Sequence, residues 1–508
     1  MTKPWHTFFF LAGIFIMLAL LMVFFPGGVD IQGFKLRVPA LTDLFDTLSV
    51  SHDSSLIQLA DLGRKVNKEQ EENEMESSSP SLPDTSLRKK NADSLASDTL
   101  HLQKELFNVQ HVPLCPIEYP EGREDLLYPF FRLLASGAAD TSLIRILHYG
   151  DSQIERDRVT SYLRNMFQTK FGGGGPGLLP AVQPYGKLLS VFHEASGEWK
   201  RYTSFGKVDY SLGHRRYGPM AALYRLTCPG DEDSICEATI TIRKNKFSYA
   251  ALRRFTRCQL LLGNCADTLT VSCYADGLLM GREKHPAPFL HRVRFTFPEF
   301  TEEITLHLTA REGTEVYGFT LDAGHGIAVD NIAMRGSAGM EFTHIDPVHL
   351  KMCYELLKPK LLILEFGGNI APTQASNYTF YGKRLYHEIS FLKSLLPSDV
   401  PLIVIGIGDM SLKENGQYVS YPNLTHIRDE MKKAAFKAGC AYWDLLKAMG
   451  GPNSMPLWVA ARPPLATRDY VHFTDLGARV MGKMFCAALN QEYERYVSSC
   501  RRGWAGQN

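Results

Sequence analysis

The sequence has no excess of charge of either sign. Lys and Arg number 55, Asp and Glu number 54, and the formal net charge is +1 over 508 residues. This balance argues against a nucleic acid partner, because nucleic-acid-binding chains usually carry a basic field. Cysteine is also scarce, with 10 residues, and no C-x-x-C pair or Cys/His cluster has the spacing of zinc ligands. We therefore expect neither a disulfide scaffold nor a structural metal site.

Neither disorder nor low complexity dominates the composition. Hydrophobic residues make up 45% of the chain and charged residues 21%, a balance typical of globular proteins. No internal repeat is evident. A chain of this length is too long for one ordinary domain and predicts about two to four.

One long hydrophobic run, from Phe8 to Phe25, lies near the N-terminus. Eighteen helical residues span about 27 Å, close to the thickness of a bilayer core. A cleaved signal peptide would have a shorter apolar region ending in small residues, whereas this run ends in Phe-Phe-Pro. We expect residues 1–29 to be an uncleaved transmembrane anchor. The bulk of the chain is placed outside the cytoplasm, because a single N-terminal anchor usually exports the chain that comes after it.

A charged, Ser-rich segment follows the hydrophobic run. Residues 65–98 contain no aromatic side chain and cannot bury enough apolar surface to offset the entropy of the chain. We predict that residues 30–114 are a flexible tether, which would let the folded body reach a distributed target such as a wall or glycan.

The remaining sequence shows two kinds of strand pattern. Continuous apolar runs at 143–149, 361–366 and 402–407 alternate with helical stretches, which predicts an α/β fold with a doubly wound parallel sheet covered on both faces. Short segments of alternating polarity predict an antiparallel β-sandwich inserted into that domain. The α/β domain is expected to comprise residues 115–190 and 326–496, with the β-rich insertion at 191–325 between them and a tail at 497–508.

A candidate nucleophile follows the first predicted parallel strand. Gly150-Asp151-Ser152 stands between this strand and a predicted helix, where open α/β sheets place their sites and where a helix N-terminus stabilises an anion. The alternative role for such a serine is a helix N-cap. A serine nucleophile needs a general base, which in turn needs an orienting carboxylate. Asp469-Tyr470-Val471-His472, close before the last long helix, offers both.

Two further motifs carry groups that can stabilise an oxyanion. Gly367-Gly368-Asn369 directly follows the run at 361–366, and Arg335-Gly336-Ser337-Ala338-Gly339 follows another β-type run. The Asn369 amide can donate to a developing negative charge, and Gly339 can offer an unhindered backbone N–H. Each motif is weak alone, but their order at successive strand ends is a much stronger signal.

This order of motifs resembles the SGNH (GDSL-type) hydrolases, which carry a Gly-Asp-Ser block, a glycine block, a Gly-x-Asn block and a terminal Asp-x-x-His block. The resemblance covers roughly residues 140–190 and 325–490 and implies a three-layer α/β/α sandwich. Two departures are visible: Gln153 stands where the family often has Leu, and Ile370 stands where it often has Asp.

The resemblance also implies a role for each matched residue. Ser152 would be the nucleophile, His472 the general base, and Asp469 the group that orients the base. The backbone N–H groups of Ser152 and Gly339, together with the Asn369 side chain, would form the oxyanion hole. This mechanism implies no metal ion and no organic cofactor.

Within this family the arrangement resembles the peptidoglycan O-acetylesterases, which have a β-sandwich inserted between the first block and the glycine block. The implied protein is an esterase that removes acetyl groups from glycan, with peptidoglycan as the first choice. The implied place is the inner membrane, with the catalytic body in the periplasm. Two alternatives stay open: an O-acetyltransferase fed by a membrane acyltransferase, and a glycan-binding protein whose triad is idle.

Other features have two interpretations each. Arg156 and Arg158 are either solvated helix charges or contacts for an anionic substrate, and the loop Gly172–Gly175 is expected to be flexible and to border the cleft. Five cysteines fall in the insertion, where pairing and free buried thiols are about equally expected. Four aromatic residues of the insertion are expected in its core more than on a sugar-binding surface: Trp199, Tyr202, Phe205 and Tyr210.

Overall fold

The computed structural model describes the backbone of β1 (Val29–Ile31) and β2 (Phe34–Leu36), and then residues 113–505 except 230–233, 265–268, 285–287 and 374. β1 and β2 pair with each other and belong to a first unit that ends at Leu59; the second unit holds all other described residues. The predicted anchor run and most of the predicted tether lie outside the described residues. Among the helices that are described, none combines the length and apolarity needed to cross a membrane.

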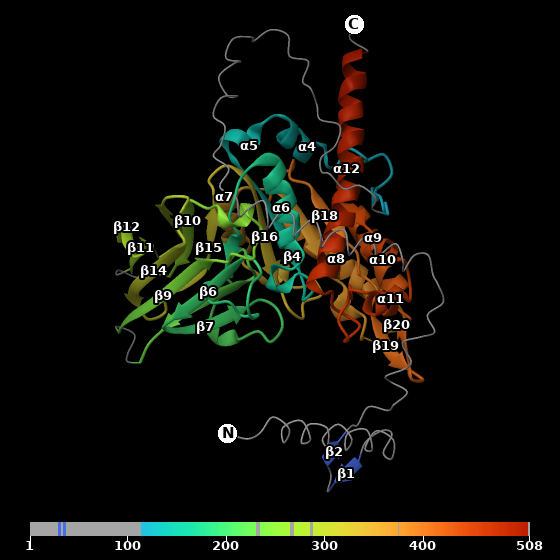
Figure 1. Ribbon diagram of the computed structural model, residues 1–508, viewed down its shortest axis with the longest axis horizontal. Coiled ribbons are helices and arrows are strands. Elements are labelled where there is room, and N and C mark those ends of the chain that lie inside the picture. The colour runs from blue at the N-terminus through green and yellow to red at the C-terminus, as the bar shows by residue number, and fades with distance from the viewer. Residues whose placement is uncertain are drawn as a thin grey trace, which may run out of the picture. The chain divides into compact units, whose positions relative to one another are not determined.

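A six-stranded sheet forms the centre of the α/β domain (Figure 1), in the order β16-β4-β17-β18-β21-β3. The first five strands are parallel, and β3 pairs antiparallel with β21. The strands are β3 (Ile117–Glu118), β4 (Leu143–Gly150), β16 (Gly326–Ala333), β17 (Pro359–Glu365), β18 (Leu402–Ile405) and β21 (Ala441–Trp443). β4 is buried along nearly its whole length, as expected for a parallel strand with both faces covered.

Helices cover both faces of this sheet. On one face, Tyr442 shares a buried core with α7, α8 and α9; on the other, the Trp443 ring packs against Phe485 of α12. The helices are α4 (Tyr128–Ala135), α5 (Ala138–Thr141), α6 (Thr160–Phe171), α7 (Pro347–Leu357), α8 (Thr379–Ser394), α9 (Leu424–Lys437), α10 (Leu445–Met449), α11 (Ser454–Ala460) and α12 (Asp475–Ala505). The prediction of an α/β fold with a parallel sheet is confirmed.

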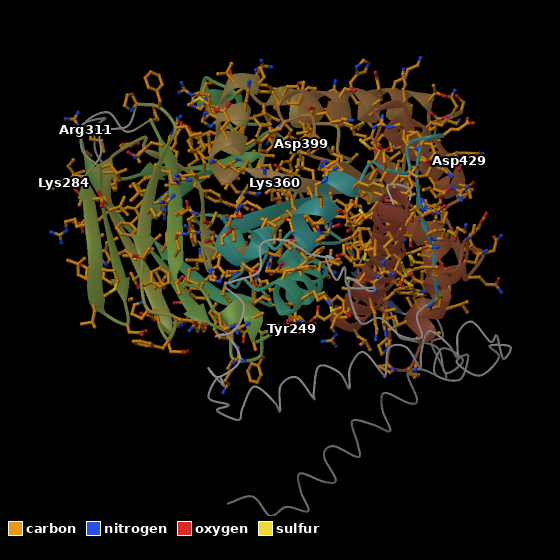
Figure 2. The ribbon with its side chains drawn as sticks, turned by 90° about the horizontal axis from the view of Figure 1, so that it is seen from above. Tyr249, Lys284, Arg311, Lys360, Asp399 and Asp429 are labelled. Atoms are coloured by element: carbon orange, nitrogen blue, oxygen red, sulfur yellow. A yellow bond between two sulfur atoms is a disulfide. The ribbon has the colours of Figure 1, made fainter. Side chains whose placement is uncertain are left out.

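Two antiparallel sheets form the inserted sandwich. One has the order β13-β10-β15-β8-β7, with β5 beside β15, and the other has the order β12-β11-β14-β9-β6. The strands are β5 (Gly177–Leu179), β6 (Val191–Ser196), β7 (Glu198–Thr203), β8 (Ala222–Thr227), β9 (Ile235–Lys244), β10 (Arg257–Gly263), β11 (Leu269–Ala275), β12 (Leu278–Lys284), β13 (His291–Thr296), β14 (Glu303–Arg311) and β15 (Glu315–Asp322). In Figure 2, Lys284 and Arg311 mark the sandwich at one end of the second unit and Asp429 marks the other end. The predicted antiparallel β-rich insertion is therefore present.

The aromatic residues singled out in the insertion divide between core and surface. Tyr202 and Phe205 are buried in the core shared with the α/β domain, and Trp199 packs partly buried against the sandwich core. The Tyr210 ring is 88% exposed. The core interpretation therefore holds for three of the four, and Tyr210 is the exception.

The Gly172–Gly175 loop differs from the expectation of a flexible loop at the cleft. Gly174 is buried, and a Cβ placed there would lie 1.8 Å from the carbonyl oxygen of Arg254. At Gly173 a Cβ would lie 2.6 Å from the backbone nitrogen of Ile327. Glycine is needed at these two positions because the chain passes between the α/β sheet and the insertion with no room for side chains.

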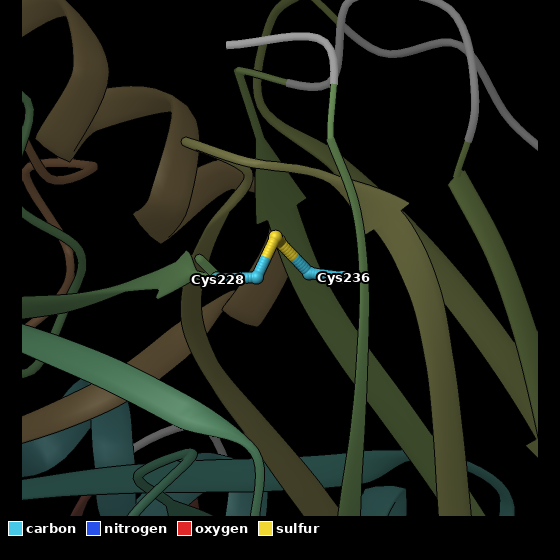
Figure 3. Close-up of a disulfide and its surroundings, with 2 residues drawn as sticks. All are labelled: Cys228 and Cys236. Carbon is cyan, nitrogen blue, oxygen red and sulfur yellow. A yellow bond between two sulfur atoms is a disulfide. The ribbon is translucent and has the colours of Figure 1, made fainter. Parts of the chain in front are cut away.

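One disulfide joins the two sheets of the sandwich (Figure 3). It links Cys228, directly after β8, to Cys236 in β9. Cys258 and Cys273 are free and buried, and Cys265 lies outside the described residues. Both outcomes that the sequence left open therefore occur in the insertion.

A buried ion cluster attaches the insertion to the central sheet. The Arg145 guanidinium on β4 donates to both carboxylate oxygens of Asp330 at 2.7 Å and to Asp322, at the end of β15, at 2.8 Å. Arg257 of β10 also donates to Asp322, at 3.2 Å, and the Leu178 N–H donates to Asp330 at 2.9 Å. Neighbouring carboxylates raise the pKa of Arg145 against the opposing effect of burial, so one cation binds strands of both the sheet and the sandwich.

Replacing Arg145 by Met is expected to lower the free energy of unfolding by about 3–5 kcal/mol, because Asp330 would stay buried without its counter-ion and Asp322 would keep only Arg257. Urea unfolding of wild type and variant measures this loss. The matched control is Arg243→Met, which removes surface ion pairs with Glu194 and Glu303 and should cost less than about 1 kcal/mol. Equal losses in the two variants would contradict the assigned role of the buried cluster.

Candidate active site

Three strand ends meet at one edge of the central sheet. Gly150, the last residue of β4, lies in register with Ala333 of β16 on one side and with Glu365 of β17 on the other. The Met334 N–H donates to the Gly150 carbonyl at 2.7 Å, and the Asp151 N–H donates to the Glu365 carbonyl at 3.2 Å. The segments that follow these strands therefore begin side by side, and they carry three of the four predicted motifs.

The turn after β4 carries Ser152 away from the sheet without entering a helix. A short 3₁₀ turn (Glu155–Asp157) follows, and α6 begins only at Thr160. Arg156 and Asp157 have positive φ angles of 60° and 69°, which interrupt helical continuation. The expectation that Ser152 lies at the N-terminus of the helix is thus wrong.

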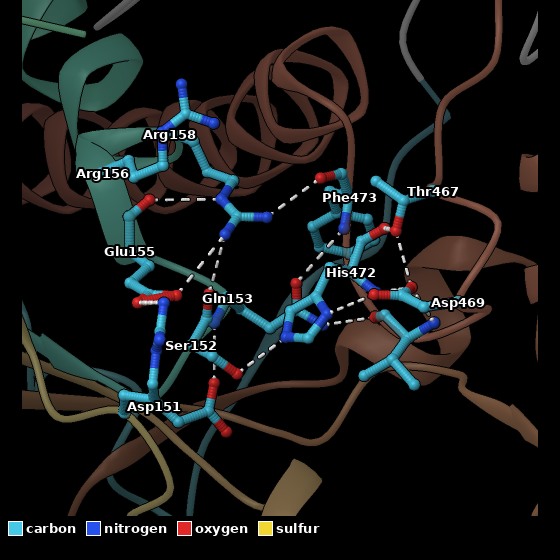
Figure 4. A network of polar contacts seen from close by, with 12 residues as sticks. Asp151, Ser152, Gln153, Glu155, Arg156, Arg158, Thr467, Asp469, His472 and Phe473 are labelled. Atoms are coloured by element: carbon cyan, nitrogen blue, oxygen red, sulfur yellow. Dashed lines mark hydrogen bonds and ion pairs between the residues drawn. The ribbon is translucent and has the colours of Figure 1, made fainter. Parts of the chain in front are cut away.

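Ser152, His472 and Asp469 form a hydrogen-bonded series (Figure 4). The Ser152 Oγ lies 2.8 Å from His472 Nε2, and His472 Nδ1 lies 2.7 Å from Asp469 Oδ2. The carboxylate accepts the Nδ1 proton, which leaves Nε2 as the acceptor for the serine hydroxyl. The structure therefore brings all three predicted residues together, across 320 positions of sequence.

The Asp469 carboxylate is held in its ionised form. Burial alone would raise its pKa, but hydrogen bonds from the Thr467 hydroxyl, the His472 ring and the N–H groups of His472 and Val471 outweigh burial and lower the pKa to about 2. Tyr470, which lies between Asp469 and His472 in the chain, has a φ of 59°, and this conformation lets the short loop fold back on itself. Asp469 thus stays negative throughout the pH range in which a histidine base works.

A hairpin supports the Asp469–His472 loop. β19 (Ser411–Glu414) and β20 (Gln417–Ser420) are joined by Asn415-Gly416, both with positive φ, the turn chemistry of a tight hairpin. The Ser411 N–H donates to the Tyr470 carbonyl at 2.9 Å, and the Tyr418 and Tyr470 rings stack 3.5 Å apart. Sequence reasoning missed this hairpin, although the Asn-Gly pair could have indicated it.

Asn369 lies beside Ser152 and the glycine block. It follows β17 through Gly367 and Gly368, and its Nδ2 donates to the Ser337 carbonyl at 2.8 Å and to Asp151 Oδ2 at 3.4 Å. These bonds orient the amide from both neighbouring loops, and Asn369 and Ser152 line the same cleft.

Gly339 does not offer the N–H that the sequence predicted. Its N–H donates to the Ser337 hydroxyl at 2.9 Å, and the residue is buried with the Phe366 ring 2.9 Å from where a Cβ would stand. The loop therefore uses this donor internally. Gly336 is exposed with a φ of 81°, and within the described residues its N–H has no acceptor.

Asp151 is a buried carboxyl group directly beneath the site. Its Oδ1 accepts the Gln153 N–H at 2.9 Å. Burial raises its pKa to about 7, and the nearby Glu365 adds to the rise while the N–H groups of Gln153 and Gly368 oppose it. Two carboxyl groups of one site thus have opposite shifts, because Asp469 is well hydrogen-bonded and Asp151 is more deeply buried.

A cleft of about 240 Å³ opens over Ser152. One wall comes from the segment Gly406–Met410 after β18, which sequence reasoning did not assign to the site. Its position after a parallel strand could have indicated it, because open α/β sheets bind ligands at these ends. In the described residues of the chain, no group of three or more His, Cys, Asp or Glu side chains is arranged to hold a metal ion.

The comparisons with known proteins agree with this geometry at the level of fold. No family model matches the sequence, and no curated protein sequence matches it significantly. Among solved structures, the chain is similar to a peptidoglycan O-acetylesterase at 18% identity and a TM-score of 0.56, covering 72% of this chain and 96% of that one. The chain therefore resembles that O-acetylesterase in fold.

Two further similar structures have lower scores. An acetyl xylan esterase matches at 17% identity over 32% of this chain and 81% of its own, with a TM-score of 0.25. A GDSL-like lipase from Bacteroides ovatus matches at 12% identity over 59% of this chain and 98% of its own, with a TM-score of 0.24. The resemblance in fold therefore rests on the O-acetylesterase.

Replacing Asp151 by Asn should stabilise the protein more at high pH than at low pH. The raised pKa means that the unfolded chain loses this proton near pH 4 and the folded chain only near pH 7, so wild-type stability falls across that window. The variant has no carboxyl group to titrate at this position, so its stability does not fall in this way. The difference in free energy of unfolding between variant and wild type should grow from near zero below pH 4 to a few kcal/mol above pH 7.

Thermal unfolding of both proteins from pH 4 to pH 8 measures this advantage. The exposed Asp140→Asn makes the same chemical change on the surface and should follow wild type throughout. An advantage of Asp151→Asn that does not vary with pH would contradict the assignment.

Proposed function

We propose that this chain is a serine esterase that removes O-acetyl groups from glycan, with peptidoglycan as its first substrate. The observation that carries the proposal is the series from Ser152 through His472 to Asp469, with bonds of 2.8 and 2.7 Å. A cleft of about 240 Å³ over the serine provides room for an acylated sugar.

The proposed reaction is acyl transfer in two steps. His472 Nε2 takes the Ser152 proton as Oγ attacks the acetyl carbonyl, and the ionised Asp469 stabilises the imidazolium that forms. The Ser152 N–H and Asn369 Nδ2 would receive the oxyanion, with Nδ2 giving up its long 3.4 Å bond to Asp151 for the new acceptor. His472 then gives its proton to the departing sugar oxygen. A water molecule attacks the acyl-enzyme by the same route and releases acetate.

The choice of substrate is supported by the solved structure with the similar fold, which is a peptidoglycan O-acetylesterase. The sugar and the position of its ester belong to the proposal. The O-acetyltransferase and the idle glycan-binding protein that the sequence left open would give different results in the assay below.

The assay follows acetate release from O-acetylated peptidoglycan and from a small acetyl ester, using the full chain in detergent. We expect wild type to release acetate from both and Ser152→Ala to lose at least about 10³-fold in kcat. Asn369→Ala should lose about 10²–10³-fold, because it removes one oxyanion donor.

Each other result has a distinct meaning. Release by Ser152→Ala at the wild-type rate would refute the serine mechanism. Acetyl transfer to a glycan acceptor in preference to water would favour the transferase. Glycan binding by both proteins without turnover of either ester would favour the binding protein.

We also propose that the run Phe8–Phe25 anchors the protein in the inner membrane with its body in the periplasm. The length of the run supports an anchor, and the Cys228–Cys236 disulfide supports an oxidising compartment. A membrane acyltransferase is a partner only if the chain proves to be a transferase.

Cell fractionation tests the proposed anchor. The full chain should sediment with membranes and resist extraction by high salt, whereas a chain lacking residues 1–29 but exported by a cleavable signal should appear in the soluble periplasmic fraction. Protease added to spheroplasts should digest the body of the protein if it lies on the periplasmic side of the membrane. A cytoplasmic protein that stays intact is the control. A soluble full chain would refute anchoring.

A further inference from the structure

The Ser152 turn and the His472 loop must be held together by more than the bond between their side chains. They are 320 residues apart, and a single hydrogen bond contributes little net stability. A displacement of about 1 Å between reacting groups can cost about 10²-fold in rate. The contacts that join these two segments are therefore candidates for setting the geometry of the base.

Gln153 joins the two segments through its side-chain amide. Nε2 donates to the Val471 carbonyl at 2.6 Å, and Oε1 accepts the Phe473 N–H at 3.4 Å. This is the pattern by which one residue of a parallel strand binds residues i and i+2 of its neighbour. The two bonded residues flank His472 on both sides.

The opposite side of the same segment is bound by its own loop. The His472 N–H donates to Asp469 Oδ1 at 3.0 Å, and its carbonyl accepts the Thr467 N–H at 2.8 Å. Asp469 and Thr467 therefore hold His472 within the loop, and Gln153 holds the loop on the serine turn.

Arg158 makes a second connection between the segments. Its Nη2 donates to the Ser152 carbonyl and its Nη1 to the Phe473 carbonyl, both at 3.1 Å (Figure 4), and its Nε donates to the Glu155 carbonyl at 3.2 Å. The Glu155 carboxylate, itself paired with Arg335, lies 4.0 Å away. Arg158 is thus neither a solvated charge nor a free contact for an anionic substrate.

We propose that Gln153 and Arg158 are positioning residues that set the distance between Ser152 and His472. The inference rests on the proposed function for its consequence in catalysis. Neither side chain bonds to Ser152 Oγ or to the His472 ring. Both act through backbone groups, namely the carbonyl of Ser152 and the groups of the two residues that flank His472. Loss of either should lower kcat and leave KM nearly unchanged, because the attack geometry changes and the cleft does not.

The first test compares Gln153→Met and Arg158→Lys with wild type on the small acetyl ester. Met nearly conserves the volume of Gln153 and removes both hydrogen bonds of its side-chain amide. Lys conserves the charge of Arg158, but its ammonium group cannot donate to three carbonyls in the plane of a guanidinium. We expect kcat to fall about 10–100-fold with KM within about twofold. Arg156→Ala is the matched control. The Arg156 Nε bonds only to the Lys187 carbonyl, so this side chain does not connect the serine turn to the His472 loop.

A second variant separates positioning from general stability. In Gln153→Glu the protonated carboxyl can still donate to the Val471 carbonyl, whereas the carboxylate would face that carbonyl with its negative charge. The kcat ratio of variant to wild type should therefore rise as pH falls through the titration of the new carboxyl group. A residue with a merely structural role would not give a ratio that recovers with pH.

Labelling of Ser152 by a fluorophosphonate provides a readout that needs no acetyl substrate. Slower labelling of Gln153→Met, by about 10–100-fold, would support the proposal even if wild type left both esters intact and the proposed function failed. If folded Gln153→Met and Arg158→Lys keep a labelling rate and a kcat within twofold of wild type, the positioning proposal is overturned and the esterase proposal still stands. Failure of wild type to label would overturn both.

Discussion

The parallel pairing of β4 with β16 and β17 is the constraint on which the site depends. Because all three strands run in the same direction and Gly150 is in register with Ala333 and Glu365, the segments after them leave the sheet at one edge. Ser152, Gly336 and Asn369 each follow within a few residues of these strand ends. A short departure from a rigid strand leaves little freedom, so backbone pairing at the strand ends determines where these residues lie.

Two buried or half-buried arginines of this region are compensated by carboxylates. Arg145 neutralises Asp330 and Asp322 where the insertion joins the sheet, and Arg158 is compensated by Glu155 near the serine turn. The two carboxyl groups of the site differ in the same terms. Asp469, bound by four donors, has its pKa lowered to about 2, whereas burial raises that of Asp151 to about 7. Environment rather than residue type thus assigns their roles.

Much of the organisation could be predicted from sequence, because its signals are local. Continuous apolar runs indicated buried parallel strands, and alternating segments indicated the sandwich. Motifs at strand ends indicated Ser152 and Asn369, and the motif before the last helix indicated the Asp469–His472 pair. Predictions went wrong where a conformation depends on distant contacts. The helix expected directly after Ser152 is interrupted by two residues of positive φ, and the glycines at 173–175 are packed between the central sheet and the insertion instead of bordering the cleft.

The sequence by itself determined the residue types of the triad and the order of the motifs that carry them. Hydrophobic periodicity and short motifs are local patterns, so they can be recognised without knowing which distant segments pack together. Only the tertiary structure decided which backbone donors of the glycine block are already used within their own loop. Gly339 and Gly336 are equivalent in the motif, but the Ser337 hydroxyl accepts the N–H of the first and leaves that of the second exposed. Likewise, the identity of Gln153 alone does not show what its side chain binds. Its amide has two partners only because residues 471 and 473 approach it in the folded chain.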